Sequence, residues 1–186
     1  MKTLIIGGVA GGASAAARLR RLDENCEIII LERGEYVSFA NCGLPYYIGG
    51  DIKNRSDLTL QTPESFKARF NIDVRVNNVA TAIHPDKNSV SVTDLRSGKS
   101  YEESYDYLIL SPGAEPIRPN IDGIDNEKVF TLRNIPDTLK IKNYIEKNNS
   151  KTAAVVGGGY IGVETAENLK KSGLEVTLIE LSDHLI

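Results

Sequence analysis

Cys42 is the first candidate for chemistry, because it is one of only two cysteines and lies in the unusual stretch SFANCGLPYYIGG, residues 38–50. A cysteine thiolate is a nucleophile, and helix N–H groups close to the sulfur favour that form. The letters LPYYI predict a helix start just after Cys42, which would place such groups nearby. A free cysteine can equally pack as a small apolar side chain, so the residue type alone leaves both roles open. Cys26 heads the apolar run CEIIIL and is expected in the core; nothing in the sequence supports a Cys26–Cys42 disulfide.

A second set of candidate residues repeats along the chain. Residues 3–33 and 152–181 both read as an apolar strand, a glycine turn, an amphipathic helix, a second apolar strand and an acidic residue. The matched residues are Gly7 with Gly157, Gly12 with Gly162, and Glu32 with Glu180.

The repeated pattern is the fingerprint of a dinucleotide-binding site. Its glycines allow a tight turn, a close approach of the pyrophosphate and close helix packing, while the helix N-terminus faces the phosphates. The closing glutamate accepts hydrogen bonds from a ribose diol. Val9 replaces the middle glycine of the first copy, whereas the second copy keeps Gly159. A 2′-phosphate beside Glu180 would be repelled, and no Arg or Lys follows in LSDHLI, so NADH is favoured over NADPH.

The elements that must position these residues can be predicted from local patterns. Residues 14–22 are alanine-rich and favour a helix. Thr62 and Pro63 are typical of an N-cap and a first helical residue, so a helix is expected over 62–70. Further expectations are a helix over 135–149, strands through 72–110 with a hairpin turn around Gly98, and a crossover at 111–123.

Composition limits the class of protein. The chain has 186 residues, 41% of them hydrophobic, and a net charge of −3. This charge gives no reason to expect nucleic-acid binding, no apolar run could span a membrane, and no metal site is predicted. Two cysteines without a secretion signal favour a reducing cytoplasm.

Together, these residues resemble the FAD-dependent pyridine nucleotide–disulfide oxidoreductases, most specifically through YVSFANCGLPYYIGGDI at 36–52. In that family the first fingerprint holds FAD and the second holds NAD(P)H. Dithiol members carry a second cysteine where this chain has Tyr47, so the resemblance implies the single-cysteine type. Ala10 stands where the NADH oxidase and peroxidase branch usually has a histidine. The sequence is therefore most similar to coenzyme A disulfide reductases, including rhodanese-fused forms.

The resemblance also implies site residues. Cys42 would be catalytic. Arg18 and Arg21 alone would read as solvated helix charges, but in this family such a pair can clamp coenzyme A phosphates. The residues implied to bind coenzyme A are Ser14, Arg18, Arg21, Ser38 and Asn41. The residues implied to bind FAD or the nicotinamide cofactor are Gly7, Val9, Ala10, Gly11, Gly12, Glu32, Arg33, Asn41, Val79, Ser111, Gly113, Gly157, Gly159, Tyr160, Ile161, Gly162, Glu164 and Glu180.

The implied fold class is α/β: a Rossmann-like FAD-binding domain of the three-layer ββα type, then the first β-α-β unit of a second, NAD-binding Rossmann-like domain. The expected boundaries are 1–115 for the FAD domain, 116–150 for the crossover and connecting helix, and 151–186 for the start of the NAD(P)H domain. Because a doubly wound half needs more strands than this, the chain is expected to be cut short.

The implied activity is FAD-dependent, NADH-linked reduction of coenzyme A disulfide, or of a related small-thiol disulfide or persulfide, in a homodimer of the full-length protein. The alternatives are an NADH oxidase or peroxidase that cycles a cysteine sulfenic acid, and a nucleotide-binding fragment without turnover.

Overall fold

The computed structural model describes residues 1–186 and divides the chain into two compact units. The first unit comprises Met1–Phe39 and Thr59–Ala114. The second comprises Ala40–Leu58 and Glu115–Ile186. Each unit is described by itself.

A four-stranded parallel sheet forms the middle layer of the first unit. Its strands are β1 (Lys2–Ile6), β2 (Glu27–Glu32), β3 (Asp73–Val76) and β7 (Tyr107–Leu110), in the order β3-β2-β1-β7. The central strands are runs of Ile and Leu because both faces of a parallel sheet are covered.

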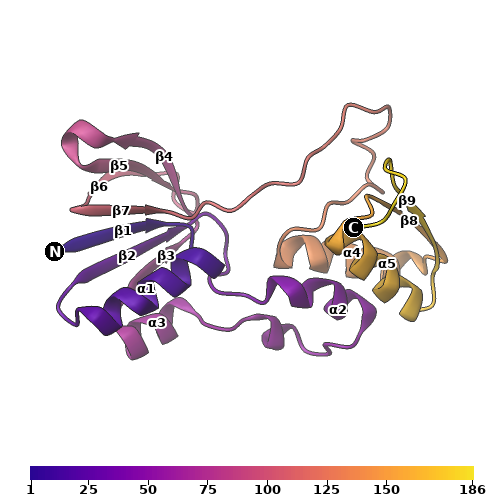
Figure 1. Cartoon of the computed structure of the whole chain (residues 1–186), viewed down its shortest axis with the longest axis horizontal. Coiled ribbons are helices and arrows are strands. Elements are labelled where there is room, and N and C mark those ends of the chain that lie inside the picture. Colours follow the sequence, from indigo (N-terminus) through magenta and orange to yellow (C-terminus); the bar gives the residue numbers. More distant parts are fainter. The chain divides into compact units, whose positions relative to one another are not determined.

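Two helices, α1 (Ala10–Leu22) and α3 (Pro63–Phe70), cover one face of this sheet (Figure 1). Small residues of α1, Ala13 and Ala16, let the helix pack closely on the strands, and Phe66 of α3 completes the same core. Helix α1 begins at Ala10, earlier than the 14–22 expected from composition, because the glycine turn leads directly into it.

A three-stranded antiparallel sheet covers the other face. It consists of β4 (Asn78–His84), β5 (Ser89–Asp94) and β6 (Ser100–Ser104), and a short 3-10 turn, η3 (Pro85–Lys87), joins β4 to β5. Val90 and Val92 of β5 pack on the parallel strands through Leu4. This arrangement confirms the predicted three-layer ββα fold.

An ionic cluster of side chains from β1, β3 and β6 links these two sheets. The carboxylate of Glu103 on β6 accepts hydrogen bonds from Lys2 of β1 and Arg75 of β3. Arg75 also contacts Asp73, at 2.9 Å. Burial alone would raise the pKa of Glu103, but the hydrogen bonds from Lys2 and Arg75 outweigh it and lower that pKa.

The second unit is built from helices and one parallel strand pair. Strands β8 (Thr152–Val156) and β9 (Glu175–Ile179) pair in parallel, and Leu169 and Leu174 pack with Ile48 in the core. The remaining elements are η1 (Asn41–Gly43), α2 (Leu44–Gly49), η2 (Arg55–Leu58), α4 (Ile135–Asn148) and α5 (Tyr160–Lys171).

Several local predictions are confirmed. The Thr62 side chain accepts a hydrogen bond from the backbone N–H of Ser65, and the Ser65 hydroxyl oxygen accepts one from the backbone N–H of Thr62, which is a capping box. Gly98 has a φ of +72° in the β5–β6 turn. Helix α4 ends one residue before the predicted 149, and residues 111–123 hold no helix or strand. The expected nucleotide-domain boundaries, 1–115, 116–150 and 151–186, stay predictions. No helix has the length and apolar character needed to cross a membrane.

Candidate functional site

The first glycine turn joins β1 to α1 and cannot accept larger residues at two places. Gly7 has a φ of +94°, a conformation that favours glycine. A Cβ on Gly12 would lie 1.8 Å from the carbonyl oxygen of Gly7. The segment after β7 closes over the turn, since the Ser111 N–H donates to Ile6 O at 2.7 Å and the Ser111 hydroxyl would lie 3.2 Å from a Cβ on Gly11. The structure thus brings four predicted FAD contacts together: Gly7, Gly11, Gly12 and Ser111.

Glu32 closes this turn from the end of β2. Its two carboxylate oxygens accept the backbone N–H groups of Gly8, at 2.8 Å, and Gly34, at 2.7 Å. Each oxygen keeps a lone pair for a further donor. The orientation of the carboxylate is therefore set by the backbone, and the exposed Arg33 follows it directly.

Two other predicted FAD contacts lie further from the turn. Val79 pairs with Thr93 in the antiparallel sheet. Two residues earlier, Asn77 donates its backbone N–H to Gly34 O at 3.0 Å, so the start of β4 lies beside the loop that holds Glu32. Gly113 is exposed and has a φ of +75°.

The second glycine turn repeats this geometry between β8 and α5. Gly157 has a φ of +107°, and a Cβ on Gly162 would lie 1.9 Å from Gly157 O. Glu180 accepts hydrogen bonds from the backbone N–H groups of Gly158, Leu181 and Ser182, the last at 2.8 Å. The bonds from Ser182 and Gly158 lower the pKa of Glu180, which keeps the carboxylate charged.

Both turns fit a bound pyrophosphate. Neither α1 nor α5 has a side-chain N-cap, and neither carries an acidic residue in its first turn, so their first N–H groups are free to face an anion. Gly159 is informative because its φ of −73° suits any residue and a Cβ there would meet nothing within 4 Å. The fold itself does not require this glycine, but a closely approaching ligand would.

The remaining predicted nicotinamide-side residues lie on the first turns of α5. Tyr160 and Ile161 are 74% and 59% exposed. Glu164 is half-buried, and its backbone carbonyl accepts a hydrogen bond from the Asn168 amide at 2.8 Å.

Most of the predicted coenzyme A residues of the first unit line one open cavity of about 450 Å³. Ser14 and Arg21 of α1 and Ser38 are among its walls, together with the cofactor-side residues Val9 and Ala10. Arg18 is exposed on α1 and does not line the cavity. Sequence reasoning missed the rest of the wall, which is mainly apolar: Phe39, Leu60, Gln61, Phe66 and Phe70, with Ala13 and Ala17 of α1.

Backbone geometry at Ser38 shapes this cavity. Its φ of +49° is unusual for a residue with a side chain. Its N–H donates to Gly8 O at 3.0 Å, and its carbonyl accepts the N–H groups of Leu60 and Gln61. Two segments distant in sequence are thereby joined, which no local pattern could have indicated.

Cys42 lies in the second unit, in η1, and is an exposed free thiol, whereas Cys26 is free and buried. The alternative of a buried, packed Cys42 is therefore wrong, and the expected burial of Cys26 is confirmed. The side-chain oxygen of the neighbouring Asn41 is buried without a hydrogen-bond partner. Such an oxygen is costly unless a ligand or water satisfies it. The position of Cys42 relative to the first fingerprint stays a prediction.

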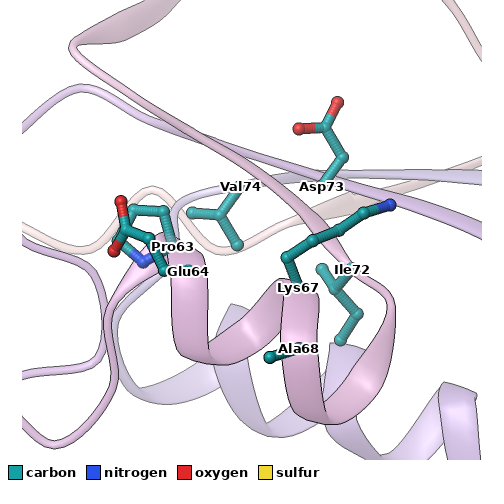
Figure 2. Close-up of a pocket in the computed structure, with 7 residues that line it drawn as sticks. All are labelled: Pro63, Glu64, Lys67, Ala68, Ile72, Asp73 and Val74. Atoms are coloured by element: carbon teal, nitrogen blue, oxygen red, sulfur yellow. The ribbon is translucent and has the colours of Figure 1, made fainter.

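A second open cavity, of about 530 Å³, lies between α3 and β3 (Figure 2). Its walls include Glu64 and Lys67 of α3 and Asp73 and Val74 of β3, but none of the predicted site residues. No group of His, Cys, Asp or Glu side chains could hold a metal ion.

Comparisons with known proteins agree with this geometry. All of residues 1–186 match the family described as pyridine nucleotide-disulphide oxidoreductase. The chain is 44% identical over 182 residues to coenzyme A disulfide reductase of Staphylococcus haemolyticus, covering 98% of this chain and 41% of that protein. It therefore spans less than half the length of this curated relative.

Solved structures give the same picture. A reduced Bacillus anthracis protein named CoADR-RHD is 53% identical, with a TM-score of 0.96 over 100% of this chain and 33% of its own. The NAD-dependent persulfide reductase of A. fulgidus is 39% identical, with a TM-score of 0.94 over 100% of this chain and 35% of its own. The water-forming NADH oxidase of Lactobacillus brevis is 32% identical, with a TM-score of 0.90 over 100% of this chain and 40% of its own. On the family match and these relatives, the chain belongs to the pyridine nucleotide-disulphide oxidoreductases, a family of oxidoreductase enzymes.

Proposed function

We propose that the protein containing this chain uses FAD and NADH to reduce coenzyme A disulfide, or a related small-thiol disulfide or persulfide, through Cys42 as the single redox-active thiol. The observation that carries the proposal is the combination of two glycine turns suited to dinucleotides with one exposed free cysteine. The similarity to coenzyme A disulfide reductases supports the substrate class.

The first turn is the proposed FAD site. The uncapped N-terminus of α1 would face the pyrophosphate, the Glu32 carboxylate would accept from the ribose, and Ser111 would close the turn. FAD, when bound, supplies a two-electron store between the nicotinamide and a sulfur.

The second turn is the proposed NADH site. Glu180 is held as a carboxylate by three backbone N–H groups, so it can accept from a ribose diol and would repel a 2′-phosphate. This charge is the reason to propose NADH rather than NADPH.

The proposed sulfur step belongs to Cys42. Its thiolate attacks one sulfur of coenzyme A disulfide, the S–S bond breaks, one coenzyme A leaves as a thiolate, and the other stays in a mixed disulfide with Cys42. Two electrons and a proton then release the second coenzyme A and restore the thiol. Tyr47 stands where dithiol relatives have their second cysteine, so the resolving thiol must come from the substrate.

The cavity beside α1 is the proposed seat of the coenzyme A nucleotide. Arg21 lies in its wall with Ser14 and Ser38, while Phe66 and Phe70 supply apolar surface. A guanidinium binds phosphates strongly, and aromatic rings suit an adenine face. Arg18, one turn away on the same helix, would add charge at the rim.

Two measurements on the full-length protein test the proposal. The non-reduced protein should carry an adduct of coenzyme A mass on Cys42, and NADH should reduce coenzyme A disulfide in the wild type but not in Cys42→Ser. Unimpaired disulfide turnover in Cys42→Ser would sink the proposal. Rapid peroxide or oxygen turnover with little disulfide turnover would instead identify an NADH oxidase or peroxidase.

A further inference from the structure

The short helix α2 connects Cys42 to the rest of the second unit. It begins at Leu44, two residues after Cys42, and has only six residues. A helix this short is unstable by itself and leaves its last carbonyls without intrahelical partners. The position of the Cys42 turn therefore depends on what holds α2 in place.

Lys142 of α4 binds the C-terminal end of α2. Its ammonium donates to the backbone carbonyls of Tyr47, at 3.1 Å, and Ile48, at 3.4 Å. A positive charge is favourable at this end of a helix. The same ammonium lies 5.1 Å from the centroid of the Tyr47 ring, within the range of a cation–π contact.

The Lys142 side chain is well placed for this role. Only 25% of it is exposed, and it also forms an ion pair with Glu146 on the same helix, at 3.8 Å. Its contacts with α2 join residues 95 and 94 positions apart in the sequence. Lys140, two residues earlier on α4, is exposed and shows no such contact, so it is a matched control.

Helix α5 holds α2 from another side. Ile48 packs against Leu169 and Leu174, and a Cβ on Gly49 would lie 2.6 Å from the buried Asn168 Oδ1. Lys171 of α5 also pairs with Asp51 just after α2, at 3.6 Å, and the backbone N–H groups of Asp51 and Ile52 donate to Tyr46 O. Lys142 supplies the side-chain hydrogen bonds to the carbonyls of Tyr47 and Ile48.

We propose that Lys142 is a positioning residue for Cys42: by holding the carbonyl end of α2 it fixes the turn that carries the sulfur. The inference rests on the proposed function in that it takes Cys42 to be the reacting thiol. Thiol–disulfide exchange requires a particular alignment of the attacking sulfur, and a small displacement slows it strongly. Lys142 therefore acts on the sulfur step and not on NADH binding.

The test compares Lys142→Met, Lys142→Arg and Lys140→Met in the full-length protein. Lys142→Met keeps most of the aliphatic stem but loses the donors, whereas Lys142→Arg keeps them. The first readout is hydrogen exchange in peptides from residues 40–58, with residues 63–76 as the reference. The second is the single-turnover rate at which coenzyme A disulfide reoxidises the reduced enzyme, with the KM for NADH measured alongside.

Lys142→Met should speed exchange within residues 44–52 about tenfold and slow reoxidation about tenfold, as expected for the loss of hydrogen bonds to a charged group. The KM for NADH should stay unchanged. Lys142→Arg should restore both rates, and Lys140→Met should behave as the wild type. If Lys142→Met does not fold, Lys142→Gln, which loses the positive charge and has a shorter side chain with a neutral amide NH2, should slow reoxidation relative to Lys142→Arg.

Two results would overturn the positioning role: faster exchange with unchanged reoxidation, or equal slowing by Lys142→Met and Lys140→Met. Failure of the proposed function is seen separately, because Cys42→Ser would then still reduce coenzyme A disulfide.

Discussion

Replacing Gly12 with alanine should force α1 away from β1. A Cβ at this position would lie 1.8 Å from Gly7 O and 3.0 Å from a methyl carbon of Ile5. Restoring an ordinary contact with the carbonyl needs an opening of more than about 1 Å, and a backbone atom cannot rotate away. Overpacking usually lowers the free energy of unfolding by about 1–3 kcal/mol. Because the clash here is with a backbone atom, we expect a loss near ~3 kcal/mol, compared with a typical total unfolding free energy of about 5–15 kcal/mol.

The neighbouring Gly11 provides the control. A Cβ there would meet only the Ser111 side chain, with the hydroxyl oxygen at 3.2 Å and the Cβ at 3.6 Å, and that hydroxyl can rotate. Alanine also favours helix over glycine, so Gly11→Ala should change the free energy of unfolding by less than about 1 kcal/mol. Urea unfolding of the flavin-free protein, followed by circular dichroism, measures both. Equal urea midpoints for the two variants would refute the reasoning.

Two further predictions concern single interactions in the first unit. Glu103→Gln removes the negative charge that pairs with both Lys2 and Arg75, and it should lower the unfolding free energy by about 2 kcal/mol in urea unfolding at pH 7. Because the pKa of Glu103 is lowered in the folded protein, its contribution to the unfolding free energy is present above the unfolded pKa and disappears as the pH falls through the folded pKa. The wild type should therefore lose its stability advantage over Glu103→Gln in acid. A difference in unfolding free energy that stays constant down to acidic pH would contradict this. Thr62→Ala breaks the capping box with Ser65 and should lower the unfolding free energy by about 1 kcal/mol, whereas Thr62→Ser should restore it; thermal unfolding distinguishes the two.

Local patterns predicted the parts of the fold that local forces determine. The glycine turns depend on backbone conformation at positions such as Gly7 and Gly157, and the start of α3 depends on Thr62, so short stretches of sequence contain the necessary information. The ββα layering, in contrast, was an expectation from the family resemblance, and the two packed sheets of the first unit confirm it.

The contacts that complete the candidate site were not predictable in this way. Lys142 reads as one of several lysines on a polar helix, and only the folded chain shows that it meets carbonyls of α2. The cavity beside α1 likewise combines Ser14 with Phe66 and Phe70 from a distant helix. Such pairings depend on tertiary packing of segments far apart in sequence, which periodicity does not report.

Residues Ala40–Leu58 interrupt the first unit in the sequence, and the two ends of this segment are joined by backbone contacts. Phe39 forms a β-bridge with Thr59, and the Ala40 N–H donates to Leu58 O at 2.8 Å. Because only backbone groups make these contacts, the junction itself does not depend on the side chains between its two ends. A segment grafted between these two paired positions could keep the backbone junction, but it would also have to preserve the packing of Ile48 on Leu169 and Leu174 that holds α2 in the second unit.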